Sequence, residues 1–453
     1  MPTLPLLVHG HLDATVAWRG GVAVSVGQFL RDVESLAAQL PPGRHVLNLC
    51  GNRYRFLVAL AACLVSGRVS LLPPNHTQEM VRQMQRLAPD VFCIRDQDAC
   101  DVDLPGFRFQ DAGTQASGAP GIPQIPQDQV AALVFTSGST GEPTPHRKRW
   151  GSLVRNVQAE AARLGIGPAH ALVGTVPAQH MYGLETTVLL PLQCGAALHE
   201  GNPFYPDDIC TALDQLPRPR VLATSPFHLR ALLAAQEVLP AADLVLSATA
   251  PLSAQLAAEA ERRFGCPLLE IYGCTETGQL ATRRTTAGAA WQTFPDVRLR
   301  HEGETVWAEG GHIDAPIRLS DVIEPIASRP GHFLLHGRHA DLVNIAGKRT
   351  SLAYLNYQLN AIPGVEDGVF LLPPDDAEAL ESVRRLAALV VAPRLTSAAL
   401  MHALRERIDP IFLPRPLLFV DALPRNATGK LPHPLAQALL AGAQAKSAQR
   451  LQA

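Results

Sequence analysis

A run of small, hydroxyl-bearing residues between positions 136 and 143 is the stretch of this sequence best suited to binding phosphate. Its glycines allow consecutive backbone N–H groups to point toward an anion, and its four hydroxyls add further donors. We therefore expect this loop to hold the phosphates of a nucleotide. The loop reads Thr136-Ser137-Gly138-Ser139-Thr140-Gly141-Glu142-Pro143.

The loop is predicted to lie between a strand and a helix. Residues 130–134 form an apolar run typical of a buried strand, and residues 150–164 have helical periodicity. Such strand–loop–helix units bind phosphate at the N-terminus of the helix. The loop is not a Walker A motif, because neither Gly-Lys pair, at 347–348 and 429–430, is followed by serine or threonine. Taken alone, a cluster of this kind is also compatible with a solvated surface turn.

Length and composition predict a globular protein of at least two domains. The chain has 453 residues, of which 47% are hydrophobic and 18% charged, and it is too long for one ordinary core. A net charge of -2 gives no reason to expect nucleic acid as a partner. The most apolar stretch, residues 56–65, is too short to span a bilayer. No secretory signal is evident, and the eight scattered cysteines lack a CxxC pair, so a cytoplasmic location is expected.

Periodicity predicts an α/β fold. Up to about residue 280, apolar runs alternate with amphipathic segments, which is typical of mostly parallel sheets covered by helices, with ligands at the carboxyl ends of the strands. We predict a large N-terminal domain, residues 1–337, and a small α+β C-terminal domain, residues 338–453. The clearest elements are strands at 69–72, 244–247 and 387–391, a helix at 352–360, and a helix at 253–264 closed by Gly265.

Four stretches, in collinear order, resemble the adenylate-forming superfamily, which includes acyl-CoA synthetases and acyl- or aryl-AMP ligases. The segment around His180 and the pair Ser320-Asp321 resemble the acyl-pocket and ribose-binding segments of that family. The similarity covers nearly the whole chain, and it is greatest to compact, stand-alone bacterial members. The four stretches are the hydroxyl loop, Tyr272-Gly273-Cys274-Thr275-Glu276-Thr277-Gly278, Gly337-Arg338-His339-Ala340-Asp341 with Gly347-Lys348-Arg349, and Pro424-Arg425-Asn426-Ala427-Thr428-Gly429-Lys430.

The resemblance implies ATP-dependent activation of a monocarboxylic aryl or acyl acid to an acyl-adenylate, with Mg²⁺ as a further cofactor. The small domain would then rotate, and the acyl group would pass to the pantetheine thiol of coenzyme A or of a carrier protein, with AMP and pyrophosphate released. Two alternatives stay open. The protein could be a ligase with a non-thiol acceptor, or a catalytically retired relative that binds nucleotide or acyl ligand.

The resemblance also implies a role for each residue that matches a family motif. A carboxylate and an α-phosphate brought to about 4 Å repel by about 4 kcal/mol at an effective dielectric of about 20, so cations are needed. Lys430 would supply one from the small domain, Thr275 would donate to the α-phosphate, and Glu276 would bind magnesium. The nucleotide would contact Thr136, Ser137, Gly138, Ser139, Thr140, Gly141, Ala248, Thr249, Tyr272, Asp321 and Arg338. The acyl pocket would consist of Met181, Phe227, Ala248, Ile271 and the catalytic His180, and pantetheine would pass Gly347.

Two positions depart from the family pattern. Thr144 stands where family members usually carry a lysine, so we expect Arg147, Lys148 or magnesium to supply the missing positive charge. The residue on which the small domain pivots falls at Ala340, next to Asp341, so the pivot is expected to differ as well.

Overall fold

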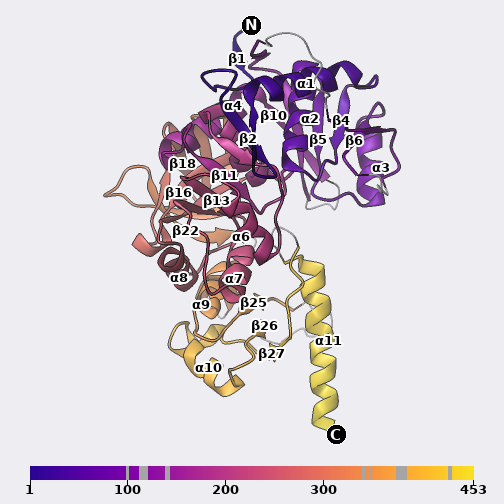
Figure 1. Cartoon of the computed structure of the whole chain (residues 1–453). Coiled ribbons are helices and arrows are strands. Elements are labelled where there is room, and N and C mark those ends of the chain that lie inside the picture. Colours follow the sequence, from indigo (N-terminus) through magenta and orange to yellow (C-terminus); the bar gives the residue numbers. More distant parts are fainter. Residues whose placement is uncertain are drawn as a thin grey trace.

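The chain folds into a large lobe and a smaller one that carries its C-terminal part (Figure 1). In this computed structural model the described residues are 1–97, 102–111, 121–137, 143–338, 342–345, 348–373, 385–426 and 431–452. Strands alternate with helices through most of the large lobe, so the expected α/β fold is confirmed. No helix among these residues is both long enough and apolar enough to cross a bilayer.

The first sheet of the large lobe has six strands, in the order β10-β9-β5-β4-β6-β7. Its neighbours run parallel except for β9 and β10. Helices α1, α2 and α3 begin after Ser25, Asn52 and Thr77, whose side chains each accept a backbone N–H of the first helical turn. The elements are β4 (His45–Asn48), β5 (Val69–Leu72), β6 (Phe92–Arg95), β7 (Gly106–Arg108), β9 (Val130–Ser137), β10 (Pro143–Arg149), α1 (Val26–Gln39), α2 (Arg53–Val65), α3 (Gln78–Leu87) and α4 (Trp150–Leu164).

The second sheet has eleven strands, in the order β21-β22-β17-β16-β15-β14-β13-β11-β12-β2-β3. The strands from β2 to β15 in this order are parallel, and antiparallel strands extend the sheet at both ends. The elements are β2 (Thr15–Arg19), β3 (Val22–Ser25), β11 (Ala171–Gly174), β12 (Ala197–His199), β13 (Arg220–Thr224), β14 (Leu244–Ser247), β15 (Leu268–Cys274), β16 (Gly278–Arg283), β17 (Trp291–Thr293), β21 (Asp321–Pro325) and β22 (His332–Arg338).

Both faces of the second sheet are covered, which explains why its central strands are apolar without alternation. Successive residues of one strand enter different cores: Leu172 packs with α1, α2 and α4, whereas Val173 packs with α6, α7 and α8. The covering elements are the π-helical segment Gly183–Leu189, α5 (Leu190–Cys194), α6 (Pro206–Asp214), α7 (Pro226–Ala235) and α8 (Ala254–Phe264).

The small lobe has cores of its own. Two hydrophobic clusters contain only residues from 343 onward, and the other four contain only residues up to 335. The expected domain boundary at 337–338 stays a prediction, which this division supports. The elements of the lobe are β23 (Leu342–Ile345), β24 (Lys348–Ser351), β25 (Asp367–Leu371), β26 (Ala387–Val391), β27 (Leu417–Phe419), α9 (Leu352–Asn360), α10 (Ser397–Arg405) and α11 (His433–Gln452).

Among the described residues, five further strands belong to the large lobe. They are β1 (Thr3–Pro5), β8 (Gln124–Pro126), β18 (Val297–Glu302), β19 (Thr305–Gly310) and β20 (Ile313–Leu319).

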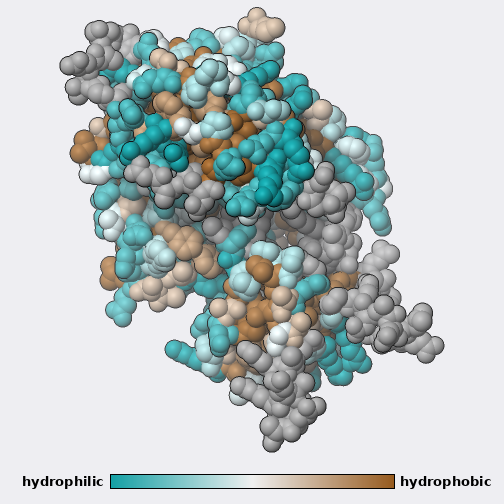
Figure 2. All heavy atoms as spheres, turned by 90° about the vertical axis from the view of Figure 1, so that its right-hand side faces the viewer, coloured by the Kyte–Doolittle hydropathy of each residue, from teal (hydrophilic) through white to brown (hydrophobic). Residues whose placement is uncertain are grey.

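An ion pair joins the two lobes. Arg230 on α7 places its NH1 atom 3.5 Å from Oδ1 of Asp367 on β25. Asp367 also accepts two hydrogen bonds of 2.7 Å from Arg425 of the small lobe. Figure 2 shows the small lobe below the large one, with hydrophobic residues gathered on the face turned to the viewer. Of the described large apolar side chains in this lobe, Phe419 and Leu435 are among the exposed ones.

The expected strand–loop–helix arrangement around the hydroxyl loop is wrong. Strand β10 intervenes before α4 and pairs antiparallel with β9, with Pro143 opposite Ser137, so the loop joins two antiparallel strands. β10 reads Pro-Thr-Pro-His-Arg-Lys-Arg and has no apolar alternation by which to predict it. Its inward side chains, His146 and Lys148, find polar partners instead of a hydrophobic core.

Candidate active site

Several predicted site residues meet at the carboxyl ends of the parallel strands. His180 follows β11, Ala248 and Thr249 follow β14, and Tyr272 lies near the end of β15. Because β11, β13, β14 and β15 are neighbours in this order, these residues share one edge of the sheet. This is the edge at which open α/β sheets bind their ligands.

Tyr272 and Asp321, which are far apart in the sequence, are brought into direct contact. The phenol of Tyr272 donates to Oδ2 of Asp321 over 2.9 Å. The ring of Tyr272 packs at centroid distances of 5.7 Å from Trp291 and 5.8 Å from Phe333, which fixes its position. Asp321 begins β21 and is the direct backbone partner of Arg338 on β22. Two residues expected to bind the ribose therefore lie on paired strands next to the tyrosine expected to bind adenine.

The segment at the end of β14 has a strained backbone. Thr249 has a φ of 79°, a left-handed conformation that is unfavourable for a β-branched residue. Strain of this kind costs on the order of 1–3 kcal/mol and is concentrated at ligand sites. The conformation of Thr249 is therefore consistent with its position in a binding segment.

The histidine-bearing segment between β11 and α5 makes an unusually tight turn. A Cβ atom on Gly183 would lie 2.0 Å from the carbonyl oxygen of Pro177, so only glycine fits there. The helix is π-helical over Gly183–Leu189 and α-helical again from Leu190. His180 is half-buried at the start of this segment. Single π turns within helices are common at functional sites.

The predicted acyl-pocket residues fall into two groups. Ala248 and Ile271 are buried in one hydrophobic cluster, against which Met181 packs. Phe227 belongs to another group, on α7, where its ring lies 6.2 Å from Phe204 and 5.3 Å from His228. Three of the four apolar residues therefore belong to the same large hydrophobic core.

The turn between β15 and β16 carries Thr275 and Glu276, both half-buried. Nε2 of His146 on β10 lies 3.6 Å from Oε1 of Glu276. Burial opposes ionisation of this carboxyl, but hydrogen bonds from its own backbone and from Cys274, with the charges of His146 and Lys148, hold the pKa of Glu276 below its ordinary value. Glu276 is thus a carboxylate at neutral pH.

The residues present fit a magnesium ion. Among the described residues no group of three or more His, Cys, Asp or Glu side chains could enclose a metal. Magnesium does not require such a cage, because it is usually bound by one or two carboxylates together with substrate phosphates and water. One ionised carboxylate, that of Glu276, at the site predicted to hold a nucleotide matches this pattern.

Three residues near the site were not identified from the sequence. Arg53, at the start of α2, is 1% exposed and donates hydrogen bonds of 2.9 Å to the carbonyls of Gly174 and Val176, so it fixes the end of β11. Burial lowers the pKa of Arg53 to about 10. Glu185 and His146 are the other two. No local pattern distinguishes these residues from ordinary surface charges.

The remaining predicted residues lie outside what the structure describes. For Thr136, Ser137 and Arg338 only the backbone is described. The others, Gly138, Ser139, Thr140, Gly141, Gly347 and Lys430, are not among the described residues.

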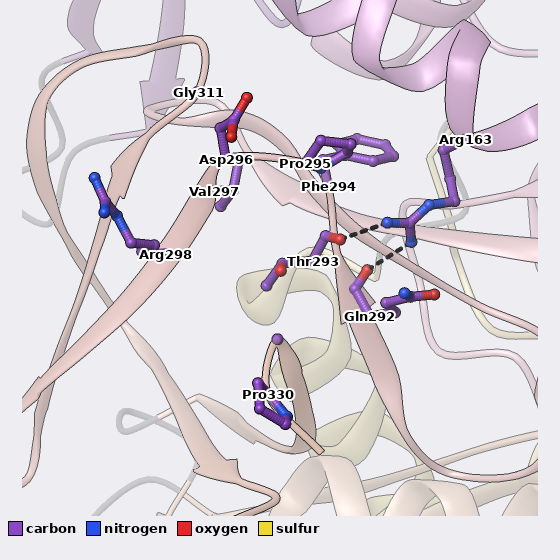
Figure 3. A pocket seen from close by; sticks show the side chains of 11 residues that line it. Arg163, Gln292, Thr293, Phe294, Pro295, Asp296, Val297, Arg298, Gly311 and Pro330 are labelled. Carbon is purple, nitrogen blue, oxygen red and sulfur yellow. Dashed lines mark hydrogen bonds between the residues drawn. The ribbon is translucent and has the colours of Figure 1, made fainter.

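A separate hollow of about 680 Å³ is lined by residues of α4 and of the segment 292–298 (Figure 3). Arg163, one of the two arginines that line it, donates to the carbonyls of Thr293 over 2.7 Å and Gln292 over 3.3 Å. None of the predicted site residues lines this hollow. It is therefore distinct from the site at the strand ends.

Fold and site together define a two-lobed α/β enzyme of the adenylate-forming class. The model of the family described as AMP-binding enzyme matches residues 8–308. The chain belongs to this family, and the resemblance inferred from its motifs is confirmed.

Named relatives and solved structures agree with this placement. The 4-coumarate–CoA ligase of Rhodobacter capsulatus is 32% identical over 67% of this chain and 76% of its own. The 3-hydroxybenzoate–CoA/4-hydroxybenzoate–CoA ligase of Thauera aromatica is 25% identical over 68% of this chain and 66% of its own. The fold matches that of ATP-bound MatB from Rhodopseudomonas palustris with a TM-score of 0.79, at 20% identity over 95% of this chain and 96% of that one. The expected enzyme class, an AMP-forming acid–thiol ligase, is confirmed.

Proposed function

We propose that the protein activates an aromatic monocarboxylic acid with ATP to an acyl-adenylate and transfers the acyl group to the thiol of coenzyme A, releasing AMP and pyrophosphate. The observation that carries the nucleotide part is the contact between Tyr272 and Asp321, which lies opposite Arg338. The acid and the acceptor are supported by two relatives, whose names specify aromatic acids and coenzyme A.

The chemistry assigned to each residue follows from its position. Asp321 accepts hydrogen bonds from the ribose hydroxyls while Tyr272, braced by two aromatic rings, lies along the adenine. Thr275 donates to the α-phosphate and stabilises the charge that develops there as the carboxylate attacks. A magnesium ion bound by Glu276 would neutralise the departing pyrophosphate. Lys430 bridges the attacking carboxylate and the α-phosphate.

The acyl group occupies the space near Met181, Ala248 and Ile271, with His180 at its carboxylate end. The three cluster members are apolar, so the pocket favours a flat hydrocarbon over a second carboxylate. An aromatic acid fits this environment, and so does a medium-chain acyl acid. The names of the relatives favour the aromatic acid.

The proposed function is tested by carboxylate-dependent ATP–pyrophosphate exchange with a panel of acids. The panel contains hydroxycinnamic and hydroxybenzoic acids, medium-chain fatty acids and short dicarboxylic acids. We expect the exchange rate with aromatic acids to exceed that with fatty acids by about tenfold, because the loss of one or two hydrophobic contacts has an effect of about this size. Dicarboxylic acids should stay at background. No exchange with any acid would identify a retired relative.

The acceptor is tested in the same reactions with coenzyme A and a phosphopantetheinylated carrier protein in parallel. Thioester on coenzyme A is expected. Thioester on the carrier protein alone would assign the acceptor to the carrier protein. Adenylate formation with neither thioester would point to a non-thiol acceptor.

Replacement of Asp321 by alanine is expected to raise the KM for ATP about tenfold. The change removes the acceptor of the ribose hydroxyls, and a tenfold effect corresponds to about 1.4 kcal/mol, the size of one hydrogen bond to a charged group. Steady-state exchange with varied ATP measures it. Glu324→Ala is the matched control, because Glu324 lies on the same strand and its side chain is 63% exposed. An unchanged KM in Asp321→Ala would remove the assignment.

A further inference from the structure

Lys148 is a buried cation directly beneath the turn that carries Thr275 and Glu276. It is 7% exposed, and its Nζ donates to the carbonyl oxygen of Glu276 over 3.0 Å. Lysine is almost never buried to this degree unless it is paired. Its neighbour Arg147 is on the exposed side of the same strand, where alternate side chains point the other way. The ammonium of Lys148 therefore points to this turn and binds its backbone.

Three other side chains contact the next two residues of the same turn. Nε2 of His312 donates to the carbonyl of Thr277 over 2.9 Å. Gly278 has a φ of 77°, and a Cβ there would lie 2.2 Å from Nδ2 of Asn156 and 2.7 Å from Oε1 of Glu185. Successive residues 276, 277 and 278 are thus each fixed by a different part of the fold. The turn has little freedom to relax while all three contacts are present.

Glu185 is the acidic group that influences Lys148 most strongly. It is 1% exposed, and Nδ2 of Asn156 donates to its Oε1 over 2.7 Å. Burial lowers the pKa of Lys148, and among the nearby charges Glu185 acts most strongly in the opposite direction. Burial raises the pKa of Glu185 to about 8, and Lys148 in turn opposes this shift. Because Glu185 belongs to the π-helical segment after His180, the pair connects the turn to the predicted acyl pocket.

We propose that Lys148 is a positioning residue that fixes the 275–278 turn so that the Glu276 carboxylate and Thr275 face the nucleotide and its magnesium ion. This proposal rests on the proposed function. It assigns to Lys148 a task different from the phosphate contact expected from the sequence. Loss of the ammonium would leave the Glu276 carbonyl without its hydrogen-bond donor. The turn would then relax, and the carboxylate would bind the metal with poorer geometry.

The first test is Lys148→Met, which keeps the length of the side chain and removes its charge. We expect the magnesium concentration for half-maximal pyrophosphate exchange to rise about tenfold, with a smaller change in the KM for the acid. Arg82→Met, which removes an exposed basic side chain on α3, should stay within about twofold of the wild type. Lys148→Arg keeps the cation and should recover part of the magnesium response.

A second readout does not depend on activity. Backbone amide hydrogen exchange of the full-length, ligand-free protein should be at least about tenfold faster over residues 274–278 in Lys148→Met than in the wild type. The turn between β18 and β19, at residues 303–304, serves as an internal reference. The hydrogen-exchange measurement is informative even if the wild type activates none of the acids tested. Failure of the proposed function and failure of this inference are thereby distinguished.

The double variant Lys148→Met/Glu185→Gln separates positioning from stability. It also replaces the buried acid next to the lost ammonium with a neutral amide, so its thermal midpoint should return toward the wild-type value. The magnesium requirement should stay elevated, because the Glu276 carbonyl still lacks its donor. A wild-type magnesium requirement together with wild-type exchange over the turn, in either variant, would make Lys148 a purely structural residue and overturn the proposal.

Discussion

Lys430→Ala is expected to lower carboxylate-dependent ATP–pyrophosphate exchange by at least about 10²-fold, the usual consequence of losing one positioned charge that stabilises a transition state. Lys430 itself lies outside the described residues. The start of its segment is well anchored, because Arg425 makes two hydrogen bonds of 2.7 Å to Asp367 on β25.

Thioester formation from supplied acyl-adenylate is expected to be nearly unaffected by Lys430→Ala. The reason is that the family resemblance places the lysine away from the site once the small domain has rotated. Single-turnover transfer to coenzyme A measures this half-reaction. Lys446→Ala is the control, since Lys446 is another lysine of the small domain and lies in α11. Equal losses in both half-reactions would contradict the rotation.

Glu276→Gln is expected to lower pyrophosphate exchange by about 10²-fold at millimolar magnesium, because a neutral amide is a poor ligand for a hard cation. The isosteric change keeps the shape of the turn, so the defect should shrink as magnesium is raised. ATP affinity measured calorimetrically without magnesium should stay close to the wild-type value. Glu302→Gln, an exposed change at the end of β18, is the control.

A Glu276→Gln enzyme whose exchange shows an unaltered magnesium response would contradict the metal assignment. The comparison with Lys148→Met is informative, because that variant keeps the carboxylate and changes only the support beneath it. Glu276→Gln should therefore have the larger effect. A larger loss of exchange in Lys148→Met than in Glu276→Gln would show that Lys148 does more than position the turn.

Elements with strong apolar patterns were predictable from the sequence. Strands β5, β14 and β26 and helix α9 have the expected bounds. Helix α8 ends as expected at Gly265, which has a φ of 67°. These elements are bounded by turn residues and bury complete faces, so local sequence and tertiary structure agree.

Elements that bury polar side chains were not predictable in the same way. β10 ends in three consecutive basic residues, and its inward residues are held by a turn more than a hundred residues away. The π-helical segment Gly183–Leu189 has the composition of an ordinary helix, and its geometry depends on the tight turn at Gly183. In both cases the deciding contacts are long-range, and periodicity in a short window cannot report them.

Site residues that belong to a recognisable motif were predictable from the sequence. Residues that only support such a motif from outside it were less predictable. Tyr272 and Asp321 were identified individually, and their contact emerged only from the pairing of β15, β16, β17, β22 and β21. Arg53 and Glu185 are both buried, and each contacts neighbouring segments from inside the fold. Burial of a charge is the least expected outcome for these residue types, so composition argues against it.

The ion pair between Arg230 and Asp367 makes the arrangement of the two lobes sensitive to ionic strength. The side chain of Arg230 is 34% exposed, so dissolved ions can reach the pair. At about 0.15 M salt the screening length is about 8 Å, and it shortens further as salt is added. Concentrated electrolyte would weaken this attachment while leaving the Arg425 contact, which travels with the small lobe, in place. The strength of the attachment between the two lobes is therefore a property that the surrounding medium can adjust.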